Sequence, residues 1–271
     1  MVNATISAPL VNHAKQKLAR NELVLCLAVN QMRSPDIALI AASCGFDAIF
    51  IDMEHGPTAL ESASAVSVAA LGFGVTPIAR IASHHAHDMA RYLDSGGMGL
   101  MVPHVDDAEQ AEAIVRYCKF PPRGMRSAPG TIPGLRFESL PQPEVNRILD
   151  EQVLLAAMIE TPTGLANIDA IAAVDGIDLI HIGALDLSTV MGLAPGDMHH
   201  PAMQAAFETV AAACHKHGKA MGVGGARGDR ALQQRLVDLG VRYLTLGSDF
   251  GYLMAAARPD VSAVRAMLPG T

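Results

Sequence analysis

Several apolar segments of this sequence end in polar residues whose side chains could together perform acid–base or metal-assisted chemistry. The residues that close these segments are Asp52, Glu54, His55, Arg80, Glu160 and Asp186. If the segments are parallel strands, their carboxyl ends meet on one rim, where enzymes of several folds place their catalytic groups. The rim would then hold two separate carboxylates, an Asp/His pair and an arginine, a combination that chance rarely produces in so apolar a sequence.

Glu160 and Asp186 are the expected ligands of a divalent metal ion. They follow apolar runs that should form neighbouring strands, so their carboxylates could meet. Two close anions repel each other, and a hard cation such as Mg²⁺, Mn²⁺ or Co²⁺ relieves the repulsion while binding the carboxylate oxygens. The alternative is a carboxylate pair that is satisfied by backbone amides or by an arginine.

Arg80, His55 and Asp52 are the expected catalytic side chains. The guanidinium of Arg80 is a permanent cation with a planar set of donors, which suits an oxygen that becomes an enolate. His55 could move a proton near neutral pH, and Asp52 could orient and polarise it. The alternatives are a buried ion pair of Arg80 with Asp52 or Glu160, and a loop histidine without a task. We expect Glu54 to face away from the rim.

Three other segments are weaker candidates. Ser83–His87 contains three histidines at a spacing compatible with metal binding, but its position at the start of a helix fits ordinary capping. His199 and His200 fall in an insertion and are expected at the surface. Gly222–Gly225 follows an apolar run, and exposed N–H groups in such a turn could bind an anion.

Strand-like and helix-like segments alternate along the sequence and predict a (β/α)8 TIM barrel, an α/β fold. The apolar runs are nearly continuous, as in buried parallel strands with helices on their outer side. The main alternative is an open doubly wound sheet, but no GxGxxG motif follows the first run. The expected strands are Leu23–Val29, Asp47–Asp52, Val75–Arg80, Gly99–Val102, Val153–Ile159, Asp178–Ile182, Lys219–Val223 and Tyr243–Leu246.

The segments between these strands predict helices, with two exceptions. The stretch Phe120–Pro143 is rich in proline and glycine and is expected to be irregular, and an insertion follows the sixth strand. A last helix is expected over Phe250–Ala257. No composition shift or low-complexity tract marks a boundary, and α/β barrels often reach about 250 residues as one unit. We therefore expect a single domain over residues 1–271.

The bulk composition argues against several partners. The formal net charge is −7 and no basic stripe is visible, so a nucleic acid is not expected. The apolar runs are too short to span a bilayer, and Met1–Leu18 lacks the pattern of a secretory signal. The four cysteines are scattered without a CxxC pair, as in free thiols of a reducing cytosol. We expect a cytoplasmic protein.

An ordered set of motifs resembles the HpcH/HpaI aldolase and citrate lyase family, with class II pyruvate aldolases as the most similar members. The resemblance spans about Glu22 to Arg258. The matching segments are Phe46–His55, Pro77–Arg80, Met101–Val105, Tyr117–Arg126, Ile159–Thr161, Ile182–Ser188 and Gly247–Asp249.

The resemblance implies roles for the residues that the strand-end argument selects. It implies a metal at Glu160 and Asp186, a proton-transfer histidine at His55 supported by Asp52, and an oxyanion-stabilising Arg80. The carboxylate of pyruvate would bind backbone N–H groups of the turn that precedes Asp186. Residues expected to bind substrate on this basis are Gly183, Ala184, Leu185 and Arg126.

The sequence departs from the family pattern in three places. Met158 stands where a glutamine often precedes the metal-binding glutamate, so a polar group near the site is missing. Gly183–Asp186 reads Gly-Ala-Leu-Asp where Gly-Pro-Ala-Asp is common. After Arg126 the usual glycine-rich loop reads Ser127–Gly130. The two expected metal ligands match the family pattern, whereas these differences affect the turn that would bind the substrate carboxylate and leave the identity of the substrate open.

The expected reaction is reversible aldol cleavage of a 4-hydroxy-2-oxo acid to pyruvate, or a close analogue, and an aldehyde. The metal and Arg80 would stabilise the enolate charge while His55 moves the proton of the 4-hydroxyl. No lysine ends an expected strand, which disfavours a Schiff-base mechanism. Alternatives are a citrate-synthesising or CoA-thioester lyase, a 2-oxo acid decarboxylase or hydratase, and a non-catalytic binding protein.

The expected terminal helix also bears on assembly. Leu253 and Met254 make Phe250–Ala257 apolar for a helix that would be left in water. The family resemblance further implies oligomers in which a terminal helix packs on a neighbouring subunit. We expect a homo-oligomer, with a hexamer as the favoured state.

Overall fold

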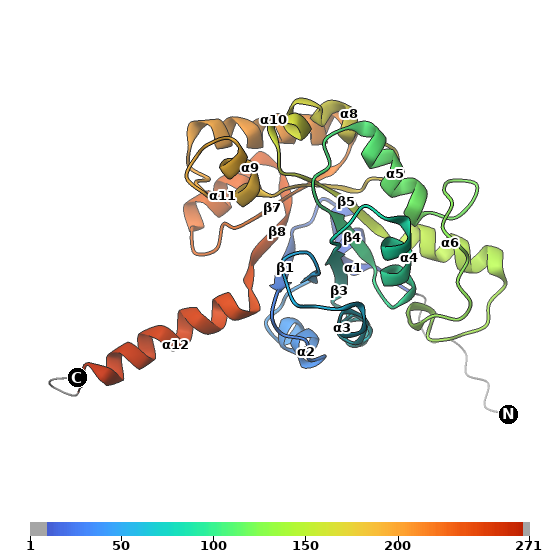
Figure 1. The fold of residues 1–271 in the computed structure, drawn as a ribbon, viewed down its shortest axis with the longest axis horizontal. Coiled ribbons are helices and arrows are strands. Elements are labelled where there is room, and N and C mark those ends of the chain that lie inside the picture. Colours follow the sequence, from blue (N-terminus) through green and yellow to red (C-terminus); the bar gives the residue numbers. More distant parts are fainter. Residues whose placement is uncertain (1–9, 268–271) are drawn as a thin grey trace.

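The strands close into a parallel barrel, which confirms the predicted (β/α)8 fold. The computed structural model describes residues 10–267 (Figure 1). Each strand pairs in parallel with the next one along the chain, and β8 pairs with β1 to close the ring. The strands are β1 Val24–Val29, β2 Ala48–Asp52, β3 Thr76–Arg80, β4 Gly99–Val102, β5 Leu154–Ile159, β6 Leu179–Ile182, β7 Ala220–Gly224 and β8 Val241–Ser248.

Most helices follow a strand and pack on the outside of the barrel, whereas the first helix precedes the first strand and the last helix projects away from the barrel (Figure 1). They are α1 His13–Ala19, α2 Asp36–Ser43, α3 Leu60–Gly72, α4 Ala86–Asp94, α5 Ala108–Cys118, α6 Gln142–Gln152, α7 Pro162–Ala166, α8 Ile168–Ala172, α9 Ala184–Val190, α10 Pro201–His217, α11 Arg230–Leu239 and α12 Asp249–Arg265, with a 3-10 turn at Pro133–Leu135. No helix in the described part of the chain is both long and apolar enough to cross a membrane. Part of the segment Met1–Leu18, for which no signal is expected, lies outside the described residues.

Alternate residues of each strand pack in two different cores, as barrel geometry requires. Cys26 and Phe50 belong to the cluster inside the barrel, which also contains Tyr243. Leu27 and Ile49, their neighbours in sequence, pack beneath the helices in the larger outer core. Both faces of each strand are therefore buried, which explains why the strands read as continuous apolar runs.

Three helices were not predicted, and the last helix is longer than expected. Helices α1 and α9 are short, and α6 begins at the end of the proline-rich stretch that was read as irregular. In α6 only Val145 and Leu149 are buried, so its apolar face is short, and it packs on a satellite core around Phe120. Helix α12 continues past Ala257 through Pro259, a residue that usually disfavours a helix interior.

Candidate active site

A cavity at the carboxyl end of the barrel contains most of the predicted site residues. Its volume is about 420 Å³, and its walls come from strand ends and from the loops that follow them. This is the face where barrel enzymes place their chemistry. The predicted residues that line it are Asp52, His55, Arg80, Glu160, Gly183, Ala184, Leu185 and Asp186.

Arg80 ends β3 and forms a two-point ion pair with Asp52, its register partner at the end of β2. Arg80 Nε lies 3.1 Å from Asp52 Oδ1, and Nη2 lies 2.7 Å from Oδ2. Burial alone would raise the pKa of Asp52, but the hydrogen bond and charge of Arg80 outweigh it and lower that pKa below its ordinary value. Asp52 is therefore a fixed anion that sets the plane of the guanidinium.

Asp52 contacts the backbone of His55 and not its imidazole. Its Oδ1 accepts the backbone N–H groups of Glu54 and His55, each at 3.1 Å, and its Oδ2 accepts the side-chain amide of Asn30 at 2.7 Å. The carboxylate therefore holds the loop after β2 in place. The expectation that Asp52 orients the His55 ring is replaced by an indirect role, because the carboxylate is already occupied by Arg80 and by the loop.

Glu54 faces the site, contrary to the prediction. Its Oε2 lies 3.2 Å from Arg80 Nε and 3.7 Å from His55 Nε2, and its Oε1 lies 3.7 Å from His104 Nε2. The prediction failed because side chains alternate between two faces only within a strand, and Glu54 lies beyond its end. β2 stops at Asp52, and the bend that follows turns the next carboxylate back over the guanidinium.

Glu160 is a buried carboxylate beside Asp186. Its side chain is only 1% exposed, and its Oε2 accepts the backbone N–H of His104 at 2.9 Å. Burial raises the pKa of Glu160, and the negative charge of Asp186 raises it further, while contacts with His104 and Arg80 act in the opposite direction. A buried anion next to a second anion is the electrostatic arrangement that a cation would relieve.

The two carboxylates fit a hard divalent cation. Both supply oxygen donors, and Mg²⁺-type ions are commonly held by one or two carboxylates, with water and substrate oxygens completing the shell. No cluster of three or more His, Cys, Asp or Glu residues arranged for a metal occurs in residues 10–267. Glu160 and Asp186 are therefore the candidate protein donors for a cation at this site.

Gly183 provides space for Glu160 and does not offer the N–H group that was expected of it. Its backbone N–H donates to Ile159 O at 3.1 Å, which extends the β5–β6 ladder. A Cβ at this position would come 2.5 Å from Glu160 Cγ and 2.9 Å from Cδ. The N–H groups that remain for a carboxylate are those of Ala184 and Leu185, which open the first turn of α9.

Asn30 and His104 also belong to the site and were not predicted from the sequence. Asn30 follows β1 directly and donates to Asp52, while His104 follows β4 and places its ring Nδ1 3.5 Å from Glu160 Oε2. Both residues follow an apolar strand closely, which is the signal that marks the other site residues in the sequence. Asp249, which opens α12, accepts the backbone N–H groups that follow Asn30 and so fixes that loop.

Arg126 does not lie at this cavity in the described chain. Its side chain is buried, with Nη2 2.6 Å from Asp94 Oδ1 and the guanidinium carbon 4.8 Å from the centre of the Phe120 ring. Asp94 ends α4, and this helix returns to the amino ends of the strands. The arginine therefore belongs to the opposite face of the barrel, where barrel residues usually contribute stability.

Among the other histidine candidates, His84 and His199 have ordinary structural partners. His84 Nε2 lies 2.6 Å from Pro103 O, and the exposed His199 pairs with Asp229 at 2.6 Å. In the Gly222–Gly225 segment, Gly224 and Gly225 do line the cavity. This part of the wall has no side chains of its own, and the ring of His181 lies beside Gly224.

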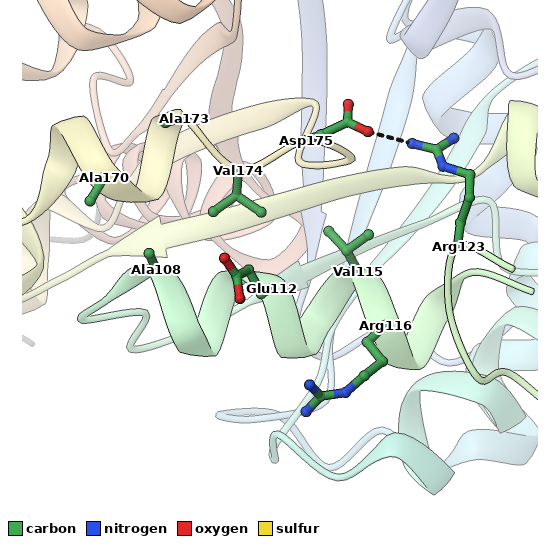
Figure 2. Close-up of a pocket in the computed structure, with 9 residues that line it drawn as sticks. All are labelled: Ala108, Glu112, Val115, Arg116, Arg123, Ala170, Ala173, Val174 and Asp175. Carbon is green, nitrogen blue, oxygen red and sulfur yellow. Dashed lines mark hydrogen bonds and ion pairs between the residues drawn. The ribbon is translucent and has the colours of Figure 1, made fainter. Parts of the chain in front are cut away.

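A second cavity lies outside the barrel, away from the strand ends. It lies between α5 and α8, and Figure 2 shows alanine and valine side chains along it with an Arg123–Asp175 ion pair at one end. Its volume, about 480 Å³, exceeds that of the strand-end cavity. Size alone therefore does not identify an active site, and the converging carboxylates and guanidinium make the strand-end cavity the candidate.

Comparisons with known proteins agree with this geometry. The model of the HpcH/HpaI aldolase/citrate lyase family matches residues 29–256. A 4-hydroxy-4-methyl-2-oxoglutarate aldolase of Hapsidospora irregularis is 37% identical over 93% of this chain and 94% of its own. The chain belongs to the HpcH/HpaI aldolase/citrate lyase family. The resemblance inferred from the motifs is confirmed.

Other HpcH/HpaI relatives extend the similarity to bacteria and to solved structures. A hydroxypyruvate/pyruvate aldolase of Pseudomonas aeruginosa is 36% identical over 92% of this chain and 91% of its own. The crystal structure of an HpcH/HpaI aldolase from Desulfitobacterium hafniense superposes with a TM-score of 0.88 at 29% identity, covering 94% of this chain and 97% of the other. All residues that line the strand-end cavity, from Asn30 to Thr245, fall within the family match.

Proposed function

We propose that this protein is a divalent-metal-dependent pyruvate aldolase. It would reversibly cleave a 4-hydroxy-2-oxo acid to pyruvate, or a close analogue such as hydroxypyruvate, and an aldehyde. The observation that carries this proposal is the convergence of Arg80, Glu160, Asp186 and His55 on one cavity at the carboxyl end of the barrel. The aldolase names of relatives that share more than nine-tenths of the chain support the same reaction class.

Glu160 and Asp186 would hold the cation, with Mg²⁺, Mn²⁺ and Co²⁺ as the candidate metals. When bound, such an ion would polarise the 2-oxo group and offset the negative charge of the carboxylates and the substrate. The N–H groups of Ala184 and Leu185, at the start of α9, would receive the substrate carboxylate, because the positive end of a helix favours an anion.

Arg80 would stabilise the oxygen on which negative charge develops. Asp52 occupies Nε and Nη2 of the guanidinium, and in the described residues Nη1 has no protein acceptor. The ion pair thus leaves one edge of a fixed, charged donor for the substrate. A donor that is already oriented needs little reorganisation when charge develops on the oxygen, and such preorganisation is the main source of oxyanion stabilisation in enzymes.

His55 would transfer the proton of the 4-hydroxyl group. Its side chain is 61% exposed at the cavity wall, and Glu54 lies 3.7 Å from its Nε2. An exposed imidazole next to a carboxylate can exchange protons with solvent and take one from a bound hydroxyl near neutral pH. Glu54 contacts both His55 and Arg80 and would keep the two groups on the same side of the cavity.

The assembly and location are also proposals. Helix α12 projects away from the barrel (Figure 1), and its large apolar side chains are exposed, with Leu253 at 57% and Val264 at 62%. Exposed apolar surface of this kind is characteristic of an interface. We propose a homo-oligomer, with the hexamer favoured, built on contacts of α12 with a second copy. The four free cysteines are compatible with a cytoplasmic protein.

The test is a turnover screen on purified, metal-loaded protein. Pyruvate and hydroxypyruvate are offered with a panel of aldehydes, and the products are identified by mass. EDTA should abolish product formation, and Mn²⁺, Mg²⁺ or Co²⁺ should restore it. Full activity after exhaustive chelation would contradict the metal-dependent mechanism. Oxaloacetate is included, since decarboxylation without any aldol product would favour a decarboxylase.

A further inference from the structure

His181 is a buried histidine on the floor of the strand-end cavity, and the mechanism above does not use it. It lies in β6, is only 4% exposed, and lines the cavity together with Glu160 and Arg80. Both ring nitrogens are buried, and neither has a hydrogen-bond partner in residues 10–267. Leaving a buried polar group without a partner is costly, so a histidine at this depth needs a reason.

The ring of His181 lies against β7 and borders the cavity. Its Cδ2 lies beside Gly222, the register partner of His181 on β7, where an added Cβ would come 2.9 Å from that atom. Its Cε1 and Nε2 lie beside Gly224, at 3.5 Å and 3.8 Å from an added Cβ. Gly224 is two residues nearer the carboxyl end, so the Nε2 edge is directed toward the cavity. The two glycines leave the space that the ring occupies.

The imidazole is neutral in the folded protein. Burial, and to a smaller extent the positive charge of Arg80, lower the pKa of His181 to about 3. A neutral imidazole offers one N–H donor and one acceptor nitrogen. Tyr243 packs edge-on against the ring at 5.9 Å between centroids, a contact that holds the ring without satisfying either nitrogen. The partner that suits such a group is an uncharged hydroxyl, which both donates and accepts.

The position of His181 relative to Met158 supports a role in substrate recognition. The two residues are register partners on β6 and β5, and both line the cavity. Met158 stands where the family pattern often has a glutamine, and it supplies no strong hydrogen-bonding group. His181 therefore places a polar group at the same depth, on the neighbouring strand.

We propose that His181 is a specificity-determining residue that hydrogen-bonds a hydroxyl on C3 of the 2-oxo acid. The inference rests on the proposed function. With the carboxylate on the N–H groups of α9, the reacting C3 carbon must face the aldehyde, which enters from the side of the exposed His55. A hydroxyl on C3 is then left to face the floor, where the Nε2 edge of His181 lies. The site accordingly favours hydroxypyruvate over pyruvate as the nucleophile.

The test compares His181→Phe with wild type on hydroxypyruvate and pyruvate, with one aldehyde in common. The ratio of kcat/KM for hydroxypyruvate over pyruvate should fall about tenfold to hundredfold, because a buried hydroxyl loses its partner. His181→Gln should retain part of the preference. Adding Met158→Gln to His181→Phe should restore part of it from the neighbouring strand. Dissociation constants of the two acids, measured by calorimetry, should show the same change in ratio.

Tyr243→Phe is the matched control, since it alters the packing beside the ring and leaves the imidazole in place. Its ratio should stay at the wild-type value. If His181→Phe lowers the melting temperature but leaves both ratios unchanged, His181 is a structural residue and the inference is overturned. A wild-type enzyme that neither binds nor turns over any 2-oxo acid would overturn the proposed function itself, and the inference with it. The two failures are therefore distinguishable.

Discussion

The guanidinium of Arg80 and the carboxylate of Asp52 meet along two parallel contacts, Nε to Oδ1 at 3.1 Å and Nη2 to Oδ2 at 2.7 Å. Asp52 is fully buried and Arg80 is 11% exposed on its side chain, so solvent screens this pair poorly. This ion pair is one of the two roles that the sequence left open for Arg80, and it is compatible with the other, a guanidinium that faces the substrate. It is a buried ion pair, and it also orients the guanidinium of Arg80 at the cavity wall.

The first prediction concerns Arg80→Lys. A lysine keeps the charge but loses the planar, two-point contact with Asp52 and the donor that faces the substrate. We expect kcat to fall by about 10²–10³, the usual cost of removing an oxyanion donor. Metal content per subunit should stay near wild type, because Arg80 is not a ligand. The measurements are steady-state kinetics and elemental analysis of the same preparations.

Arg147→Lys is the control, since Arg147 forms an exposed pair with Glu151 on α6, far from the strand ends. It should behave as wild type in every assay. An Arg80→Lys enzyme with unchanged kcat but a lower melting temperature would limit Arg80 to the structural ion pair.

The second prediction concerns Gly183→Ala. The added Cβ would press on Glu160, so this carboxylate must move from its place beside Asp186. We expect a loss of metal affinity as large as that of a direct ligand change such as Glu160→Ala, with activity falling in parallel. Gly130→Ala is the matched control, because a Cβ there meets nothing within 4 Å. Metal titration of the apoprotein measures the effect, and normal affinity in Gly183→Ala would contradict it.

The third prediction is a pH dependence of stability caused by His181. The pKa of this histidine is about 3 in the folded protein and near 6.5 when exposed, so between these values the unfolded chain binds a proton that the folded chain does not. The contribution of the neutral His181 to stability is therefore fully present above pH 6.5 and is lost as the pH falls toward 3. From pH 7 to pH 5 the loss from this group is about 2 kcal/mol.

Urea unfolding of wild type and His181→Phe at the two pH values measures this difference. The variant should lose about 2 kcal/mol less than wild type between pH 7 and pH 5. Equal losses in both proteins would mean that His181 has the same pKa in the folded and the unfolded chain, and would contradict the prediction.

The fourth prediction concerns α12. Leu253→Glu and Val264→Glu place charges on the exposed apolar face of this helix. If a second copy covers this face, each charge would be buried without a partner, and the assembly should dissociate into smaller species in light scattering. Arg258→Glu, a charge change at a polar position of the same helix, is the comparison. A monomeric wild-type protein at micromolar concentration would refute the oligomer.

The sequence by itself determined the barrel and the main components of its site. Eight continuous apolar runs, separated by helical segments, have few ways to bury both faces other than as parallel strands covered by helices. Once that architecture holds, every strand end lies on one rim, so Asp52, Arg80, Glu160 and Asp186 are brought together without further information. This inference needs only the order of residues along the strands.

Only the tertiary structure decided where side chains point beyond the last residue of a strand and at what depth they lie inside the barrel. The bend after Asp52 turns Glu54 toward Arg80, and the return of α4 takes Arg126 to the far face. The depth of His181 follows from its register with Met158 and Gly222, which are distant in sequence. Loop paths and the registers between strands arise from packing of the whole chain, so local patterns carry no record of them.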